Sequence, residues 1–291
     1  MKIEDFKKKD EKEVLFLEDN GEIPVLKYRL LEEIPWIRHC FTTREGGVSD
    51  GIFSSLNLSF TRGDREEDVR ENFSRVAKCM GSTVEQFVFT DQTHTRNVRR
   101  VTAEDGGAGI TKERGYSDID GLITDVPGLV LSTFYADCVP LYFVDTRNHA
   151  IGLSHSGWRG TVGRMGECTI KAMGEAFGTK AEDMICAIGP SICQDCYEVS
   201  EDVAEEFRAA FPGHEAEILQ DKGSGKYLLD LWRANEIVLM QAGVQKERIA
   251  TANICTCCNH RLLFSHRASH GKRGNLGAFL MLTGDREENQ K

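Results

Sequence analysis

Four stretches of the chain carry apolar residues with the period of a helix. They cover residues 63–81, 166–178, 201–211 and 231–243. In the first stretch the apolar face consists of Val69, Phe73, Val76 and Met80. Asp64 and Glu67 at its start resemble a capping box, and Gly81 follows its last apolar residue. We also expect Ser200 and Asp230 to cap the helices that follow them.

Short apolar runs between these helices are typical of strands. They cover residues 13–18, 86–90, 97–102, 128–135, 141–145, 149–153, 183–189 and 249–254. Several are apolar throughout, as strands buried on both faces are. Because helices and strands are mixed along the chain, we predict an α/β (mixed α+β) fold. We expect a single domain over residues 1–291, with mixed β-sheets flanked by helices, a core at about 39–283 and polar tails at both ends.

Composition narrows the class of protein. The formal net charge is -10, which disfavours nucleic acid as a partner, although a local cluster of arginines can still bind a small anion. Acidic residues interrupt every apolar run near the N-terminus, and no run approaches the length of a membrane span. We therefore expect a cytoplasmic protein with no membrane partner. In a reducing compartment its ten cysteines are thiols, metal ligands or nucleophiles.

One loop has the composition of a binding site. The predicted strand at 149–153 ends just before His155, and a helix is expected to begin shortly after Thr161. The small residues between them let a ligand approach the backbone, and Arg159 with free N–H groups at the helix start suits an anion. A tight structural turn with a surface arginine explains the same residues, so the pattern alone leaves both interpretations open.

Two further strand ends carry residues that can bind a metal. Asp137 and Cys138 follow the strand at 128–135, and His94 follows the strand at 86–90. An acid beside a cysteine can orient a ligand or act as a base, whereas the commonest fate of a free cysteine is burial as a small apolar group. The glycine-rich loop at 42–58 adds Arg44, Ser49 and Asn57 as candidate substrate contacts, with a solvated turn as the alternative.

The cysteines also form two closely spaced groups, Cys193 with Cys196, and Cys255, Cys257 and Cys258 with His260. Together they have the spacing of a closed structural zinc site. Neither group lies between the hydrophobic turns of a zinc ribbon, and spacing alone is a weak signal. We therefore expect these cysteines to be small structural groups and the functional metal to lie elsewhere.

Taken together, the loops resemble a known family. The segments TTREGGVSDGIFSSLNL, DQTH, DGLIT, ADCVPLYF, GLSHSGWRGT, IGPSICQDCYEV, YLLDL and FSHR look like the YfiH-like family, also called the laccase-domain or multicopper polyphenol oxidase family and described as purine nucleoside phosphorylases. The matching segments run from about His39 to about Phe279. The resemblance implies a mixed α/β fold and a zinc site of one cysteine and two histidines: His94 in DQTH, Cys138 in ADC and His155 in HSGWRGT.

The resemblance also implies an activity. Family members are described as phosphorylases of adenosine, inosine, guanosine and methylthioadenosine and as adenosine deaminases, so the expected partners are a purine nucleoside and phosphate. We expect a monomer or homodimer. The chain departs from the family at residues 271–277, and only Cys196 of the family's cysteine pair before the tyrosine is present. Neither departure touches the three implied ligands.

The chemistry of these residues agrees with that function. Three protein ligands leave one zinc position open, as in catalytic sites. We expect Arg44, Arg159 and the helix start at Thr161 to bind phosphate, Ser49 and Asn57 to contact substrate, and Asp137 and Arg44 to take part in catalysis.

Other functions fit the same ligands less well. A cysteine with two histidines is also a credible copper site, so a laccase-like polyphenol oxidase is the alternative, with copper in place of zinc. However, the eight histidines of the chain include no HxH pair, and an oxygen-reducing copper cluster needs many. A peptidoglycan-editing hydrolase and a non-catalytic zinc-binding module are the remaining alternatives.

Overall fold

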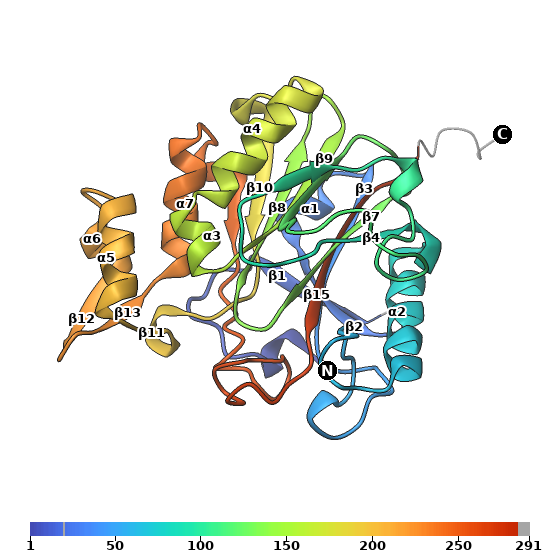
Figure 1. Cartoon of the computed structure of the whole chain (residues 1–291), viewed down its shortest axis with the longest axis horizontal. Coiled ribbons are helices and arrows are strands. Elements are labelled where there is room, and N and C mark those ends of the chain that lie inside the picture. Colours follow the sequence, from blue (N-terminus) through green and yellow to red (C-terminus); the bar gives the residue numbers. More distant parts are fainter. Residues whose placement is uncertain (20, 285–291) are drawn as a thin grey trace.

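Two six-stranded sheets packed face to face form the centre of the molecule in the computed structural model, which describes residues 1–19 and 21–284 (Figure 1). The first sheet has the order β1 (Leu15–Asp19), β2 (Pro24–Tyr28), β3 (Ile37–Thr42), β15 (Leu276–Leu282), β7 (Val130–Tyr135) and β4 (Phe87–Phe89). The second has the order β14 (Ile249–Thr251), β10 (Met184–Ile188), β8 (Val139–Asp145), β9 (Ala150–Ser156), β6 (Gly121–Thr124) and β5 (Val98–Arg100).

Helices cover the outer faces of both sheets. Helix α2 (Glu66–Met80) lies on the first sheet, and α4 (Met165–Phe177) and α7 (Leu231–Gln241) lie on the second, beside the short α3 (Trp158–Val162) (Figure 1). A small sheet of β11 (Glu198–Ser200), β13 (Lys226–Leu229) and β12 (Leu219–Gly223) packs with α5 (Glu201–Ala210) and α6 (Glu215–Ile218) at one side. The remaining helix, α1 (Arg29–Glu32), joins β2 to β3.

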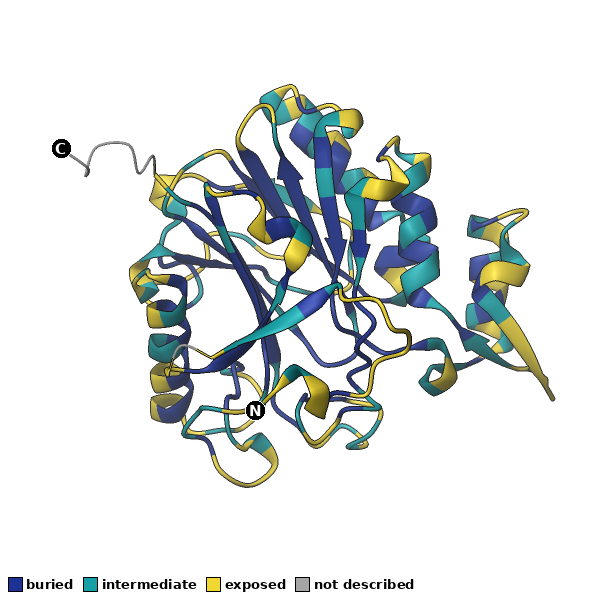
Figure 2. Cartoon of the chain, turned by 180° about the vertical axis from the view of Figure 1, so that it is seen from behind, coloured by how far each residue is buried: buried dark blue, intermediate teal, exposed yellow. Residues whose placement is uncertain are grey.

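The central strands of the two large sheets, such as β8 and β9, are buried along their whole length because both of their faces are covered. In β8, Leu141 and Phe143 pack under the helices, while Tyr142 and Val144 point into the layer between the sheets. The Tyr142 hydroxyl donates to the Cys40 carbonyl oxygen of the facing sheet at 2.9 Å. Figure 2 shows the central strands buried almost throughout, with exposed residues gathered on helices and loops. The predicted class, a mixed α/β fold with helices flanking mixed sheets, is confirmed.

The four predicted helices are present as α2, α4, α5 and α7. Asp230 caps α7, since its carboxylate accepts the Arg233 N–H at 2.9 Å. The predicted capping box at Asp64 is wrong: Arg65 is the N-cap of α2, and Asp64 instead accepts a hydrogen bond from the Asn57 amide. The serine before α5 occupies the N-cap without a capping hydrogen bond from its side chain.

Two element boundaries near the site, the end of a strand and the start of a helix, differ from those predicted from the sequence. Strand β9 extends to Ser156, so His155 lies inside the strand and not after it. Helix α3 begins at Trp158, so Thr161 lies within a helix and does not precede one. Lys7, Lys8 and Lys9 are exposed, as expected of a polar tail, but the backbone here is anchored: the Lys7 and Lys9 amides donate to Asn259 Oδ1 and the Asn253 carbonyl oxygen at 2.7 and 2.8 Å.

The other predicted tail, residues 285–291, lies outside the described residues. Among the residues that are described, no helix is long and apolar enough to cross a membrane.

Candidate metal centre and substrate pocket

Three side chains from separate strand ends meet at one edge of the two sheets. Strands β4 and β7 are parallel, so the loops that follow them, which carry His94 and Cys138, leave the first sheet on the same side. Cys138 lies in the turn from β7 to β8, and β8 pairs with β9 so that Pro140 is opposite His155. The potential ligand atoms of His94, Cys138 and His155 all lie within 4.8 Å of one another. The structure thus brings together the three residues that the sequence analysis assigned to a metal.

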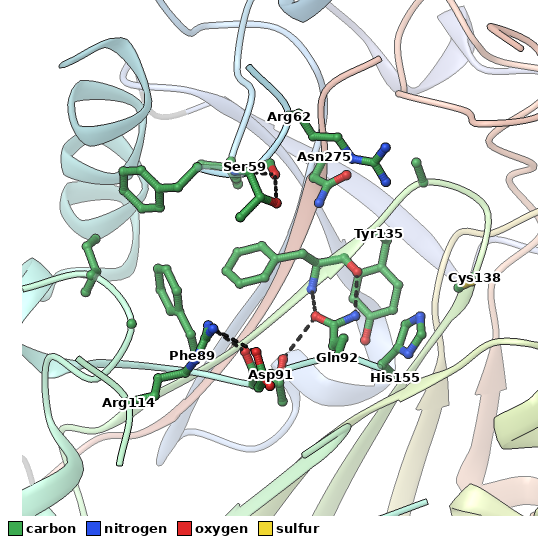
Figure 3. A pocket seen from close by; sticks show the side chains of 18 of the residues that line it. Ser59, Arg62, Phe89, Asp91, Gln92, Arg114, Tyr135, Cys138, His155 and Asn275 are labelled. Carbon is green, nitrogen blue, oxygen red and sulfur yellow. Dashed lines mark hydrogen bonds and ion pairs between the residues drawn. The ribbon is translucent and has the colours of Figure 1, made fainter. Parts of the chain in front are cut away.

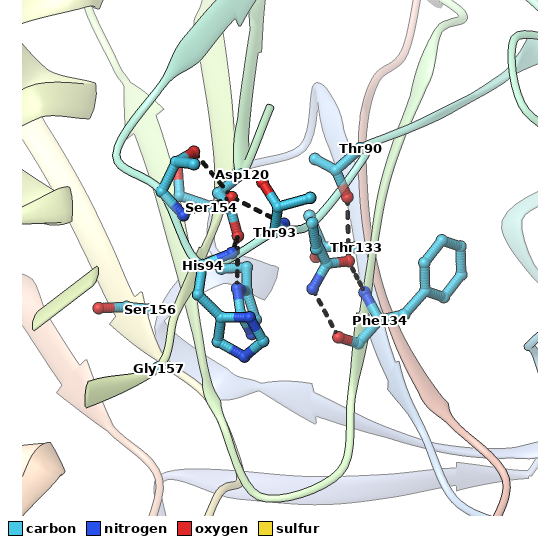
Figure 4. A network of polar contacts seen from close by, with 12 residues as sticks. Thr90, Thr93, His94, Asp120, Thr133, Phe134, Ser154, Ser156 and Gly157 are labelled. Atoms are coloured by element: carbon cyan, nitrogen blue, oxygen red, sulfur yellow. Dashed lines mark hydrogen bonds and ion pairs between the residues drawn. The ribbon is translucent and has the colours of Figure 1, made fainter. Parts of the chain in front are cut away.

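The Asp120 carboxylate bonds to the His155 ring and to the backbone around His94, and so holds two of the three residues in place (Figure 4). Its carboxylate is 2.8 Å from His155 Nδ1 and accepts the backbone N–H groups of Thr93, His94 and Thr95 at 3.1, 3.2 and 2.8 Å. Because His94 has a left-handed backbone with φ of 65°, these hydrogen bonds stabilise a conformation that a histidine rarely adopts. The bond to Nδ1 fixes the ring of His155 and leaves Nε2 to bind a metal.

The backbone of Gly157 lies so close to Cys138 and His94 that there is little space for a side chain at this position. A Cβ atom at this position would lie 3.0 Å from Cys138 Sγ and 3.1 Å from His94 Cδ2. A side chain here would therefore press on two of the three ligands.

The electrostatics favour a metal-binding thiolate. Burial opposes ionisation of Cys138, but the nearby His155 and His94 outweigh burial and lower its pKa to about 6. Burial similarly opposes the charge of His155, while Cys138 and Asp120 raise its pKa to about 9. One thiolate and two imidazoles are the donor set that zinc and copper prefer, so these residues fit the metal that the family resemblance implies.

A pocket of about 940 Å³ opens onto this group. Figure 3 shows Tyr135, Cys138 and His155 on one side of it and Phe89 and Arg114 toward the other. The Gln92 side chain holds the wall in place, since its Oε1 accepts the Phe134 N–H at 2.7 Å and its Nε2 donates to the Phe134 carbonyl at 2.8 Å. The pocket therefore combines aromatic walls with a candidate metal centre.

Three of the cations that line the pocket, Arg62, Lys112 and Arg273, lack an acidic partner among the described residues, and Lys112 donates to the Glu104 carbonyl oxygen. Arg114 is paired with Asp91 at 2.7 Å, whereas Arg62 and Arg273 make no ion pair within the described parts of the chain. Arg273 is only 8% exposed, and its Nε is buried without a hydrogen-bond partner. Burial, followed by the neighbouring charge of Arg62, lowers the pKa of Arg273 to about 10. Arg273 Nη1 donates to the Gly274 carbonyl oxygen at 3.3 Å and to Asn275 Oδ1, which leaves the Nη2 hydrogens of this cation at the pocket wall for an anionic ligand.

The residues predicted in the 42–58 loop are not among those that line the pocket. The Arg44 guanidinium donates to the carbonyl oxygens of Ser54 and His260 at 2.7 and 3.0 Å. Ser49 accepts from the Asn72 amide at 2.9 Å. Asn57 is buried and accepts the N–H of Asn275, a residue that does line the pocket, at 2.9 Å. These contacts hold the loop in shape, so the geometry gives Arg44 and Ser49 structural roles and makes Asn57 a support for the pocket wall.

The predicted anion contacts near α3 are also absent from the pocket lining. Arg159 is exposed, with its guanidinium 4.2 Å from the centre of the Trp158 ring. Thr161 is fully buried, and its hydroxyl bonds to the Gly157 carbonyl and accepts from Asn235 at 3.0 Å each. The sequence analysis placed this helix start too late in the chain, so Thr161 links α3 to α7 and does not present a free N–H to a ligand.

Asp137 lies next to Cys138 but does not line the pocket. Its two carboxylate oxygens accept from the Thr256 hydroxyl at 2.6 Å and from the Arg267 N–H at 2.7 Å. Each oxygen of Asp137 is held by one hydrogen bond, so the residue positions the turn that carries Cys138. The sequence analysis expected a catalytic role here.

Sequence reasoning missed Asp120 and Arg273. Asp120 is the first residue of DGLIT, one of the matching segments, but a lone aspartate before a strand has no distinctive pattern. Arg273 lies in the 271–277 segment, where the chain departs from the family pattern.

The comparisons with known proteins agree on the family. A family model described as multi-copper polyphenol oxidoreductase laccase matches residues 38–283. The purine nucleoside phosphorylase YlmD of Bacillus subtilis (strain 168) is 35% identical over 241 residues, which cover 82% of this chain and 86% of that protein. The adenosine deaminase RL5, from an unknown prokaryotic organism, is 34% identical over 230 residues, covering 78% and 87% of the two chains.

Solved structures give the same result. The crystal structure of YlmD from Geobacillus stearothermophilus matches with a TM-score of 0.85 and 32% identity, covering 92% of this chain and 99% of that one. The Bacillus licheniformis hypothetical protein YfiH matches with a TM-score of 0.86 and 31% identity over the same shares. The chain therefore belongs to the multi-copper polyphenol oxidoreductase laccase family.

Proposed function

We propose that this chain is a zinc-dependent purine nucleoside phosphorylase that also deaminates adenosine. The observation that carries this proposal is a three-ligand metal group that opens onto a pocket with aromatic walls and unpaired arginines. The names of two relatives, a purine nucleoside phosphorylase and an adenosine deaminase, support both activities.

The aromatic wall suits the purine base. Phe89 and Phe134 line the pocket with their ring centres 4.8 Å apart, and Tyr135 stands beside them. Flat apolar faces bind a purine by stacking, and the Asn275 side-chain amide offers a polar contact at the pocket surface. The pocket volume of about 940 Å³ accommodates a nucleoside together with phosphate.

We assign phosphate to Arg273 and Arg62. Burial and, after it, the charge of Arg62 lower the pKa of Arg273, and an anion bound between the two arginines would relieve their mutual repulsion. This assignment replaces Arg44, whose guanidinium donates to two carbonyl oxygens, and Arg159, which is exposed and does not line the pocket.

His94, Cys138 and His155 would hold the metal. When bound, zinc with three protein ligands supplies a Lewis acid that activates water or polarises a substrate atom. Asp120 keeps the His155 ring oriented by accepting from Nδ1. The arginines bring the phosphate oxygen to C1′ of the ribose, where the new C–O bond forms as the bond to the purine nitrogen breaks and its electron pair leaves with the base. In deamination, water replaces the amino group at C6 and ammonia departs.

A copper-dependent polyphenol oxidase is less consistent with these residues. The chain has eight histidines, and only His94 and His155 join a potential metal group among the described residues. That number is too small for an oxygen-reducing copper cluster beside a separate oxidation site.

We further propose that the enzyme acts in the cytoplasm. All ten cysteines are free thiols, as expected in a reducing compartment.

The test is a turnover assay on zinc-loaded protein. With inosine and phosphate, we expect hypoxanthine and ribose 1-phosphate in equal amounts, and with adenosine alone we expect inosine and ammonia. No reaction with either nucleoside, together with oxygen-dependent oxidation of a phenol by the copper-loaded protein, would overturn the proposal in favour of the oxidase.

A further inference from the structure

A second group of metal-ligating side chains lies outside the pocket lining. The sulfur atoms of Cys193, Cys196, Cys255 and Cys258 all lie within 4.8 Å of one another. Cys193 and Cys255 are buried, and the other two are half-buried. The sequence analysis judged a metal site here to be the weaker explanation. It had grouped Cys257 and His260 with these residues, and the structure leaves both outside the group.

Sheet topology explains why residues about sixty positions apart meet. Strands β10 and β14 are parallel neighbours, with Ile188 opposite Thr251. The segments that follow β10 and β14 leave the sheet at the same edge, and their pairing continues as a β-bridge between Ser191 and Cys255. Each of these two segments carries a Cys-x-x-Cys pair at this bridge or directly after it. The two pairs therefore face each other because of the backbone arrangement and not through chance contact of surface side chains.

The spacing of the sulfurs suits one tetrahedral ion. A zinc–sulfur bond of about 2.3 Å requires neighbouring sulfurs about 3.8 Å apart in a tetrahedron. Cys258 Sγ is 3.9 Å from Cys193 Sγ and 3.5 Å from Cys196 Sγ. All four residues are free thiols, so no disulfide competes for these atoms.

The surroundings stabilise negative charge on sulfur. The backbone N–H groups of Cys193 and Cys258 point at Cys255 Sγ, at 3.2 and 3.4 Å. Lys9 from the N-terminal segment is paired with Asp195, which lies between Cys193 and Cys196, at 2.8 Å, and is also close enough to interact with Cys193 and Cys258. Amide donors and a nearby cation compensate the charge that four thiolates carry around a divalent ion, whereas a purely apolar cluster of thiols needs neither.

We propose that Cys193, Cys196, Cys255 and Cys258 hold a structural zinc ion with four sulfur ligands. Four protein ligands leave no open position, so this ion takes no part in turnover. The ion joins the segment after β10 to the segment after β14. The N-terminal segment is connected to them by the Lys9 side chain and by the backbone hydrogen bonds of Lys7 and Lys9.

This ion also stabilises the turn that carries Cys138. Thr256 lies between two of the four cysteines, and its hydroxyl donates to Asp137, the neighbour of Cys138, at 2.6 Å. The Ile192 N–H, one residue before Cys193, bonds to the Asp137 carbonyl oxygen at 3.0 Å. Both Cys-x-x-Cys segments therefore contact the residue that positions the catalytic thiolate.

The decisive experiment uses a variant that lacks the other metal group, His94→Ala/His155→Ala, purified with zinc under reducing conditions. We expect one zinc per chain by elemental mass spectrometry, and X-ray absorption at the zinc edge should show four sulfur neighbours at about 2.3 Å. A folded variant without stoichiometric zinc, or with zinc bound mainly by nitrogen and oxygen, would overturn the proposal. This result does not depend on whether the protein acts on nucleosides.

Serine substitutions then identify the ligands. Cys196→Ser and Cys258→Ser should each lower the zinc content of the otherwise unchanged protein from two ions per chain to one. Cys257→Ser, at the position next to a ligand, and Cys168→Ser, in α4, are matched controls and should retain both ions. Two ions retained in both ligand variants would rule out the four-cysteine site. If a ligand variant fails to fold, the absorption spectrum of the His94→Ala/His155→Ala protein still decides the question.

Discussion

The two metal-ligating groups of this molecule differ in the number and the exposure of their ligands. The group of His94, Cys138 and His155 includes an exposed histidine and opens onto a pocket of about 940 Å³. The four cysteines are buried or half-buried, and none of them lines that pocket. Three ligands leave a position for water or substrate, and four ligands close the ion off. With the functions proposed above, ligand number and access, more than ligand type, separate the catalytic centre from the structural one.

The two groups are nevertheless connected through one residue. Asp137 precedes Cys138 in the chain and accepts a hydrogen bond from Thr256, which lies within the second Cys-x-x-Cys pair. The four cysteines Cys193, Cys196, Cys255 and Cys258 (the closed group) thus support the turn that carries Cys138. Cys138 is the thiolate of the three-ligand group with His94 and His155 (the open group). The predictions below test this division between chemistry and support, beginning with the largest expected effect.

Removing a ligand of the open group should abolish activity. In His155→Ala, we expect loss of one of two zinc ions per chain and no detectable phosphorolysis or deamination, because the remaining two ligands cannot retain the ion. Elemental analysis and nucleoside assays measure both. The control is His260→Ala, an exposed histidine outside both groups, which should keep both ions and full activity. Normal turnover in His155→Ala would place the chemistry elsewhere.

Disturbing the support of the open group should have a smaller effect. Asp120→Asn replaces the carboxylate that orients His155 and should reduce metal affinity or turnover by about 10- to 100-fold. Metal titration and kcat/KM report the change. Asp118→Asn is the matched control, because Asp118 bonds to Thr93 in the same loop without touching His155. Equal losses in both variants would mean that the loop as a whole, and not the bond to His155, is responsible.

Removing the buried arginine should separate the two reactions. Arg273→Met should raise the KM for phosphate and lower kcat/KM for phosphorolysis by roughly tenfold to a hundredfold, the effect of one lost charge-assisted contact. Adenosine deamination uses water and should change much less. Arg159→Met, at an exposed arginine outside the pocket lining, should leave both reactions unchanged. A parallel loss of both reactions in Arg273→Met would show that this arginine holds the nucleoside or the loop.

The smallest expected effect concerns the close approach at Gly157. Gly157→Ala places a methyl group 3.0 Å from Cys138 Sγ and 3.1 Å from His94 Cδ2. Because His94 is exposed and can shift, we expect a cost of about 1 kcal/mol, or roughly fivefold weaker zinc binding at the open group. Competition with a metal chelator measures this affinity. Gly163→Ala in the turn after α3 is the comparison, and an equal loss there would point to α3 rather than to the ligands.

The sequence was most informative where a pattern is local. Helical periodicity located α2, α4, α5 and α7, and apolar runs located eight strands. The sequence analysis did not include β15, which lies inside the first sheet, although Gly274 and Asn275 mark a turn just before its apolar residues. It also misjudged the end of β9 and the start of α3, where small residues continue a strand as readily as they end one.

For the site, the sequence identified ligands but not their supports. The resemblance assigned His94, Cys138 and His155, and the structure brings them together. Asp120 and Arg273 could not be assigned, because their roles arise from strand pairing and from burial beside a pocket, which a lone acid or arginine in a sequence does not reveal. That the four cysteines meet could not be decided from the sequence for the same reason. Their two pairs face each other only because β10 and β14 are parallel neighbours.

The central claim is that one chain carries an open metal centre and a closed one, and anomalous diffraction from crystals of the zinc-loaded protein tests it most directly. Data collected on both sides of the zinc absorption edge should give two peaks. One should lie among His94, Cys138 and His155 with density for a further, non-protein ligand, and the other should lie at the centre of Cys193, Cys196, Cys255 and Cys258. A single peak at the four cysteines, in crystals of a protein that is active on nucleosides, would contradict the account.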